Sequence, residues 1–331
     1  MAENKKVYSI AIIGGGAAGT MAAASAVHHN DDVILFPGSP KNKKKSRAFW
    51  VSKIENMPGL LNFSKAIEQP NREMFKTLSE SEFGDLLDLK KNRGVEKVEK
   101  NSKGLFELTD NKGESYLAKY VILTTGIMDV QPEISGSIAP IFPYANIQLV
   151  DYCLRCDGHH VIGKKTSVIG AGIAAPWVAI MLYERYQTPE MKVLTHGEEA
   201  NFSDELWELL KMYNIEVITS KIVEVHGNPK EKSLEGYTLE NGEFISTEFS
   251  FVSMGTIVYN ELAVALGAAV DNRGYVITDS KGKTSVDGLF VAGDLRAGIK
   301  KQVYTAWDSA VDSANEINRL IRMEQRDLVV E

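Results

Sequence analysis

The chain has 331 residues, 44% of them apolar and 24% charged, and a formal net charge of −7 at pH 7. These values predict a folded protein of about two domains and exclude a largely disordered chain. The negative charge argues against nucleic-acid binding, and no apolar run approaches the ~20 residues that span a membrane.

The first predicted unit is typical of dinucleotide binding. Its strand, turn, helix and second strand are Val7 to Ile13, Gly14-Gly15-Gly16-Ala17-Ala18-Gly19, Thr20 to His28 and Asp32 to Phe36. In this βαβ context Gly14 allows a tight turn, Gly16 lets backbone approach a pyrophosphate, and Gly19 lets helix and strand pack closely. The alternative is a glycine-rich turn in an ordinary α/β domain.

The two cysteines form a CxxC motif. Cys153 and Cys156 precede Asp157, and a loop this short gains little entropy from a disulfide, so the spacing favours thiol–disulfide exchange. The alternatives are inert thiols or half of a zinc site. His159 and His160 follow too closely to complete an ordinary tetrahedral site, so we expect no metal. A chain with no other cysteine fits a reducing cytoplasm, where we expect it to reside.

A second βαβ pattern follows the cysteines. Its strand, turn, helix and second strand are Thr166 to Ile169, Gly170 to Ala175, Pro176 to Tyr186 and Met191 to Thr195. Short strands alternate with turns in two further segments, Arg93 to Leu123 and Ile215 to Val252, which predict a small antiparallel sheet for each unit. Apolar spacing predicts helices over Phe202 to Tyr213 and Gln302 to Met323.

The end of the chain belongs with the first unit. Thr284 to Asp294 reads as an apolar strand that ends in Gly293 and Asp294, where an acid can accept a hydrogen bond from a ribityl hydroxyl. A helix that begins near Lys301 can point N–H groups at a flavin oxygen. The chain must then cross between domains twice, near Gly126 to Asp129 and near Met254 to Ile257.

The predicted fold class is therefore α/β, with two Rossmann-like nucleotide-binding domains of the three-layer ββα type, the second inserted in the first. We expect residues 1–126 and 255–331 to form an FAD-binding domain. Residues 127–254 are expected to form an NAD(P)-binding-like domain that carries the CxxC motif.

Taken in order, these motifs resemble the low-molecular-weight thioredoxin reductase family over nearly the whole chain. The matching segments are Gly14 to Gly19, Glu55-Asn56-Met57-Pro58-Gly59, Thr124-Thr125-Gly126, Cys153 to Gly158, and Gly293-Asp294 through Lys301-Gln302. The resemblance implies a homodimeric flavoprotein with noncovalent FAD and a thioredoxin or thioredoxin-like partner.

The resemblance also implies roles for individual residues. Cys156 would face the flavin, Cys153 would attack the partner's disulfide, and Asp157 would handle the proton. For Asp157 the alternative is a helix N-cap. Besides the glycine loop and the Gly293 and Lys301 motif positions, the FAD contacts would be Arg47, Asn56, Val95, Thr125, Gly126, Asp294, Gln302 and Val303.

The second nucleotide motif departs from that family. Where its members carry arginines for the 2′-phosphate of NADPH, this chain has His196-Gly197-Glu198-Glu199, and no arginine follows until Arg273. Two like charges ~4 Å apart cost roughly 4 kcal/mol at an effective dielectric near 20, so Glu198 would repel that phosphate. NADPH is therefore not the expected donor.

Three other electron routes remain open. NADH could place its ribose hydroxyls against Glu198 or Glu199. Ferredoxin could reduce the flavin directly, and the chain resembles the ferredoxin-dependent and deeply rooted reductases. Electrons could also run from a substrate dithiol to oxygen. A non-enzymatic flavin-binding redox sensor is the last alternative.

Further departures lie in other segments. Trp307 stands where relatives have small residues, His159-His160 stands where aromatic residues are common, and the basic run Lys41 to Arg47 could bind FAD phosphates or an acidic protein. The sequence does not decide the roles of these residues, the donor, the disulfide partner or the direction of electron flow, nor whether the domains rotate during turnover.

Overall fold

The protein is described by a computed structural model over residues 5–39 and 45–330. It divides into two compact units. Unit 1 comprises residues 1–46, 67–128 and 258–331, and unit 2 comprises residues 47–66 and 129–257. The segment 47–66 groups with unit 2, although the sequence patterns predicted it in the first domain. No helix among the described residues is both long enough and apolar enough to cross a bilayer.

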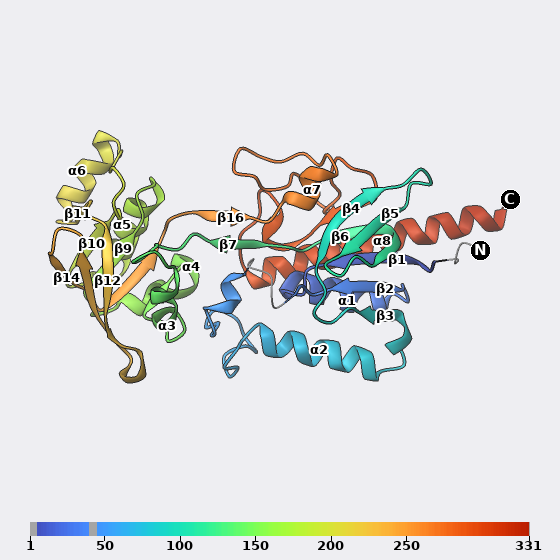
Figure 1. Ribbon diagram of the computed structural model, residues 1–331, viewed down its shortest axis with the longest axis horizontal. Coiled ribbons are helices and arrows are strands. Elements are labelled where there is room, and N and C mark those ends of the chain that lie inside the picture. The colour runs from blue at the N-terminus through green and yellow to red at the C-terminus, as the bar shows by residue number, and fades with distance from the viewer. Residues whose placement is uncertain (1–4, 40–44, 331) are drawn as a thin grey trace. The chain divides into compact units, whose positions relative to one another are not determined.

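Unit 1 is built on a mixed sheet (Figure 1). Its strands run in the order β3, β2, β1, β6, β5, β4, and β17 also pairs with β6. In that order, with β17 last, their bounds are Leu87–Leu89, Val33–Phe36, Val7–Ile13, Ser115–Leu123, Phe106–Asp110, Val95–Lys100 and Leu289–Val291. The strands β3, β2, β1, β6 and β17 are parallel, while β5 and β4 form an antiparallel meander with β6.

Helices pack against both faces of this sheet. The helices of unit 1 are α1 (Ala17–His28), α2 (Glu68–Glu80), α7 (Glu261–Ala265) and α8 (Val303–Val330). The helices α1, α2 and α8 pack against one face, and the short helix α7 packs against the other. The small residues of α1 allow close packing against α8, and both contribute to a core with Ile10, Ile12 and Phe290. Alternate strand residues such as Ala11 and Ile13 face the opposite core, as the period of two along a strand requires.

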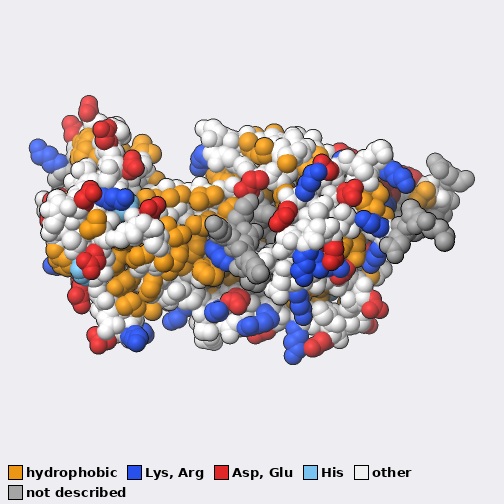
Figure 2. Space-filling model, in the orientation of Figure 1, with side chains coloured by type: hydrophobic (Ala, Val, Ile, Leu, Met, Phe, Trp, Pro, Cys, Tyr) orange, Lys and Arg blue, Asp and Glu red, His pale blue; other side chains and the backbone are white. Residues whose placement is uncertain are grey.

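Unit 2 contains a parallel sheet and an antiparallel sheet. The parallel sheet runs in the order β11, β10, β9, β15, β8, with bounds Glu216–Ile218, Met191–Leu194, Thr166–Ile169, Phe249–Val252 and Val150–Asp151. The antiparallel sheet comprises β12 (Ile222–Asn228), β13 (Ser233–Leu239) and β14 (Phe244–Ser246). The helices are α3 (Phe142–Ala145), α4 (Leu154–Asp157), α5 (Ala174–Tyr186) and α6 (Asp204–Met212). Figure 2 shows apolar side chains gathered on the visible face of this unit.

The chain crosses between the units four times, twice more than the sequence predicted, and the last two crossings pair with each other. They are β7 (Ile127–Asp129) and β16 (Thr256–Val258), which form a two-stranded sheet. Both fall at the positions expected from sequence. The two-domain Rossmann-type α/β fold is therefore confirmed. Unit 2 is inserted in unit 1 at two places, residues 47–66 and 129–257, where the sequence predicted only the second insertion.

One element prediction was wrong in detail, and the helix α2 was missed. The strand expected over Thr284 to Asp294 is shorter, because Thr284 N–H bonds to Leu289 O across a turn and only β17 is extended. Gly293 and Asp294 lie in a 3₁₀ turn after it. The helix α2 was not predicted, because its apolar face is short and it follows no capping signal.

Candidate functional site

The carboxyl ends of the parallel strands of unit 1 collect most of the predicted cofactor residues. The glycine loop follows β1, Thr125 and Gly126 follow β6, and Gly293 and Asp294 follow β17. Ligands of open α/β sheets bind outside this edge. Thr124 Oγ1 donates to the carbonyl oxygens of Ile13 and Gly14, both at 3.0 Å, which ties β6 to the loop.

The glycines of the loop separate into packing positions and an open position. A Cβ on Gly14 would lie 2.4 Å from Thr124 O, and one on Gly19 would lie 1.9 Å from Gly14 O. A Cβ on Gly16 would meet nothing within 4 Å. Backbone packing therefore requires glycine at positions 14 and 19, whereas Gly16 borders open space that a ligand can approach.

The first turn of α1 fits a phosphate group. Its N-cap, Gly16, provides no side-chain cap, and the first turn carries no acid. The N–H groups and the positive end of the dipole are thus available to an anion. Ala17 and Ala18 begin the helix, and a Cβ on Gly293 would lie 2.8 Å from Ala18 Cβ, so the β17 motif is packed against this turn. The residues present fit the pyrophosphate of FAD.

The other predicted cofactor residues of unit 1 lie at the end of β6, at the start of α8, or in β4. Thr125 Oγ1 donates to Tyr259 O at 2.7 Å. Lys301 Nζ donates to Arg296 O at 2.6 Å, and burial lowers its pKa. Gln302 precedes Val303, the first residue of α8, while Val95 begins β4 and packs against the core. Asn71, which no sequence motif indicated, donates to Gly15 O at 3.2 Å.

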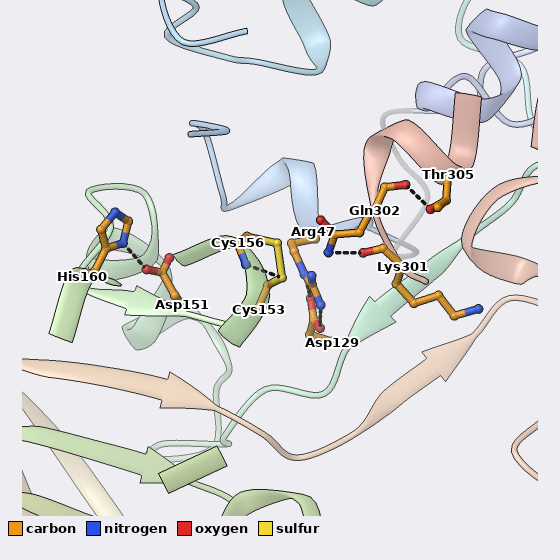
Figure 3. Close-up of a disulfide and its surroundings, with 9 residues drawn as sticks. All are labelled: Arg47, Asp129, Asp151, Cys153, Cys156, His160, Lys301, Gln302 and Thr305. Carbon is orange, nitrogen blue, oxygen red and sulfur yellow. Dashed lines mark hydrogen bonds and ion pairs between the residues drawn. A yellow bond between two sulfur atoms is a disulfide. The ribbon is translucent and has the colours of Figure 1, made fainter. Parts of the chain in front are cut away.

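Two predicted cofactor residues belong to unit 2 instead. Arg47 forms a bidentate pair with Asp129, with Nε to Oδ2 at 2.7 Å and Nη2 to Oδ1 at 2.5 Å (Figure 3). Asn56 is exposed in the segment 47–66. Their contact with FAD stays a prediction. Lys41 to Lys44 of the basic run lie outside the described residues.

Cys153 and Cys156 are joined as a disulfide in unit 2, beside α4. Cys153 is the N-cap of α4, and its sulfur accepts from Cys156 N–H at 3.2 Å. Cys153 is buried and Cys156 half-buried. Asp157 ends α4 and makes no capping hydrogen bond, so the structure does not support the N-cap alternative.

Asp157 is placed for proton transfer at this disulfide. A carboxylate oxygen of Asp157 and the two sulfurs lie within 4.8 Å of one another. The side chain is 4% exposed. Burial, followed by the negative charge of Asp151, raises the pKa of Asp157 to about 7, while the charges of His160 and Arg47 oppose the shift. A carboxyl group that titrates near neutrality can donate and accept protons at physiological pH.

Asp157 adjoins three further ionisable residues of unit 2. His160 Nδ1 lies 2.8 Å from Asp151 Oδ2, and its Nε2 lies 3.0 Å from Glu55 Oε2. Groups on Asp151, Asp157 and His160 fall within 4.8 Å of one another. We call Glu55, Asp151, Asp157 and His160 the acid–histidine cluster. In the sequence His160 stood out only as a departure from relatives, because Glu55 is distant along the chain and no motif links His160 to Asp151.

A pocket of about 340 Å³ lies at the carboxyl end of β10. It is lined by Gln131, Glu133, His196, Gly197, Glu198, Lys221 and Met254. His196 Nδ1 accepts from Ile222 N–H and its Nε2 donates to Glu133 O, both at 3.2 Å. Burial lowers the pKa of His196. The ring is therefore neutral, and among the described residues that line the pocket Lys221 alone is a cation.

Comparison with known proteins places this site in context. A family model of pyridine nucleotide-disulphide oxidoreductases matches residues 8–314. An alkyl hydroperoxide reductase component of Xanthomonas campestris pv. phaseoli is 29% identical over 72% of this chain and 44% of its own length. The thioredoxin reductase of Rickettsia felis is 28% identical over 69% of this chain and 73% of its own.

A solved structure has the same fold. The putative thioredoxin reductase TrxB of Bacillus anthracis aligns with a TM-score of 0.79 at 21% identity, covering 96% of this chain and 99% of its own. The present chain spans less than half the length of the two alkyl hydroperoxide reductase components from Xanthomonas campestris and Pseudomonas aeruginosa that it matches, 44% and 42%.

Proposed function

This chain belongs to the pyridine nucleotide-disulphide oxidoreductase family, and from that premise we propose that it is an FAD-dependent reductase of a thioredoxin-type disulfide. The observation that carries the proposal is the Cys153–Cys156 disulfide with a buried carboxyl group beside it that titrates near neutrality. The glycine loop at the N-terminus of α1 supports FAD as the cofactor. A homodimer is part of the proposal, and light scattering of twice the 36.5 kDa chain mass would support it.

The chemistry proceeds as an electron relay. Bound FAD, once reduced by the electron donor, would supply the electron pair. As the Cys153–Cys156 bond breaks, one sulfur takes a proton from Asp157 and the other becomes a thiolate. Cys153 then attacks the partner's disulfide, forming a mixed disulfide and releasing a partner sulfur that takes up a proton. Attack by Cys156 on Cys153 restores the intrachain disulfide and releases the partner's second sulfur, which takes up the proton that Cys156 loses.

We further propose that NADPH is not the donor. Among the described residues that line the pocket after β10, Glu133 and Glu198 stand against one cation, Lys221, and the histidine is neutral. A 2′-phosphate dianion would meet repulsion there, with no arginine in that lining to bind it. Reduced ferredoxin is the proposed donor. NADH is a second candidate, because carboxylates can accept hydrogen bonds from free ribose hydroxyls.

Anaerobic mixing tests the donor. The flavin band near roughly 450 nm is followed after addition of NADPH, NADH or reduced ferredoxin. We expect ferredoxin to bleach the band and NADPH to leave it unchanged. Rapid bleaching by NADPH would refute the donor proposal.

Trapping tests the partner and the division of roles between the cysteines. We expect Cys156→Ser protein to form a stable mixed disulfide with thioredoxin through Cys153, whereas Cys153→Ser protein forms none. Equal trapping by both variants would contradict the assigned roles. Absence of any adduct together with unimpaired flavin binding would favour a redox sensor instead.

A further inference from the structure

The reduction of the intrachain disulfide has a proton requirement that Asp157 alone does not meet. In the proposed cycle the proton of Asp157 passes to Cys156 and leaves with the partner, so Asp157 is deprotonated after each reduction. One proton must therefore reach the buried Asp157 from solvent before the next reduction, and the groups around Asp157 decide how it arrives. This reasoning rests on the proposed disulfide chemistry and extends it.

The acid–histidine cluster provides a continuous route from the disulfide to the surface. Asp157 lies within 4.8 Å of Asp151 and His160. His160 bridges Asp151 and Glu55 at 2.8 and 3.0 Å. Glu55 Oε2 also lies 3.1 Å from Nε2 of His159, and the side chains of Glu55 and His159 are 36% and 47% exposed. Each neighbouring pair is within reach of a hydrogen bond or one small movement.

His160 is held as a charged, oriented ring. Both ring nitrogens face carboxylate oxygens, so both donate and the ring is an imidazolium. Phe249 packs edge-on against it at a centroid distance of 6.0 Å. Although burial opposes the charge, the hydrogen bonds to Asp151 and Glu55 outweigh it and raise the pKa of His160 to about 9.

One carboxylate oxygen of Asp151, Oδ1, is buried without a hydrogen-bond donor among the described residues. The other oxygen, Oδ2, faces His160. Asp151 is 0% exposed. A buried carboxylate oxygen is rarely left without a donor, and the neighbouring Asp157 can supply one whenever its carboxyl group is protonated.

We propose that His160, with Asp151 and Glu55, is a proton relay that reloads Asp157 from solvent during disulfide reduction. His160 passes a proton inward through Asp151 to Asp157 and regains one from solvent through Glu55. No net charge is created in the core, because each proton that leaves the cluster for a sulfur is replaced at the surface. His160 is a positioning and relay residue, and Asp157 remains the group that meets the sulfurs.

Other charges near the cluster set its pH dependence. Asp157 faces Asp151, His160, Arg47 and Glu55, and Asp151 also faces Lys164. Because the imidazolium opposes the upward shift of the Asp157 pKa, its removal raises that pKa further. A relay variant should therefore change both the rate and the pH profile.

The test uses the flavin-loaded protein and dithiothreitol, so it needs neither the physiological donor nor a partner protein. Reduction of Cys153–Cys156 is followed by trapping of free thiols, and the rate is expressed per dithiothreitol thiolate across pH 5–9, a range chosen to bracket the pKa of Asp157, about 7. For wild-type protein we expect the rate to fall as pH rises through about 7 and to be independent of buffer concentration.

For His160→Gln we expect a rate lower by about tenfold, less than the ~10²–10⁴-fold that a direct acid contributes, because Asp157 remains in place. Its inflection should move to higher pH, and added imidazole should restore the rate. Glu55→Gln, at the exposed end, should reproduce the imidazole dependence. The matched control is His226→Gln, whose ring contacts Thr238 in β12–β13 and should behave as wild type.

The outcomes separate the two proposals. An unchanged pH profile and no imidazole rescue in both relay variants would overturn the relay, even if thioredoxin is reduced. Slowed, imidazole-rescued reduction in these variants would support the relay even if no thioredoxin is reduced, in which case the proposed function alone would fail. Loss of rate in His226→Gln to the same degree would also overturn the relay, because the effect would then not be specific to the cluster.

Discussion

At the scale of single residues, the most consequential group is a buried acid beside a disulfide. Asp157 is buried within unit 2. Because Asp151 is a second carboxyl group nearby, ionising both residues costs free energy through charge repulsion. The same environment that raises the pKa of Asp157 to about 7 must also couple its titration to folding.

The stability of the protein should fall as pH rises from about 4 to about 7. The folded-state pKa of Asp157 is about 7 against an ordinary 3.8, so the native state binds the extra proton in this window and loses that advantage above it. Asp157→Asn removes this dependence. Between pH 4 and pH 7 the unfolding free energy of wild type should therefore fall by up to about 4 kcal/mol more than that of Asp157→Asn.

Denaturant unfolding across pH measures the effect. The exposed Asp327→Asn serves as the control and should run parallel to wild type. Parallel curves for Asp157→Asn and wild type would show that Asp157 has no raised pKa.

Glu198 should determine part of the discrimination against NADPH. Exchanging it for arginine replaces a repulsive charge in the pocket after β10 by an attractive one. We expect Glu198→Arg to bind NADPH at least about tenfold more tightly than wild type, or about 1.4 kcal/mol, with little change for NADH. The exposed Glu231→Arg controls for net charge. Calorimetric titration with both nucleotides measures the shift, and equal gains for both would refute the assignment.

At the scale of elements, the β1–α1 turn combines glycines with opposite purposes. Gly14 has φ +120° and touches Thr124, whereas Gly16 has an ordinary φ of −76° and open space where a side chain would stand. One position serves the fold and the other leaves room for a ligand.

Two substitutions separate these roles. Gly16→Val should preserve the thermal midpoint of the flavin-free protein within a few degrees, yet lower FAD affinity by at least about tenfold, because its side chain enters the ligand's space. Gly14→Ala should instead destabilise the apoprotein, by overpacking of order 1–3 kcal/mol together with strain at positive φ. Flavin content and apoprotein melting measure both, and normal FAD binding by Gly16→Val would contradict the assigned site.

The same elements show what sequence can and cannot predict. Both βαβ units were predicted because their signals, an apolar strand and spaced glycines, lie within a few tens of consecutive residues. The pairing of His160 with Asp151 and Glu55 was not, since Glu55 is over a hundred positions away. Likewise, no local pattern marks the attachment of residues 47–66 to unit 2. The chemical roles of the predicted site residues stay predictions.

At the scale of the whole molecule, a partly buried ion pair is one of the contacts that attach residues 47–66 to unit 2. Arg47 begins the segment 47–66, and its bidentate partner Asp129 is 5% exposed at the end of β7. Removing one partner of such a pair leaves a buried charge uncompensated.

Arg47→Ala should therefore loosen the segment. We expect a loss of about 3 kcal/mol in unfolding free energy and faster hydrogen exchange confined to residues 47–66. Arg273→Ala, whose guanidinium is 72% exposed beside Asp271, is the control and should change neither. Unchanged exchange in residues 47–66 would show that the pair does not hold them.

The pairing of β7 with β16 bears on how such a chain can be assembled in evolution. Tyr259 N–H donates to Gly126 O at 3.2 Å, so the two cut ends of unit 1 are already hydrogen-bonded neighbours. Because the ends of the insertion 129–257 meet in this way, a tight turn of two or three residues can replace it without displacing the sheet of unit 1. Residues 129–257, which carry the disulfide, can then be exchanged between proteins in one genetic event, whereas residues 47–66 of the same unit and the glycine loop stay with the host chain.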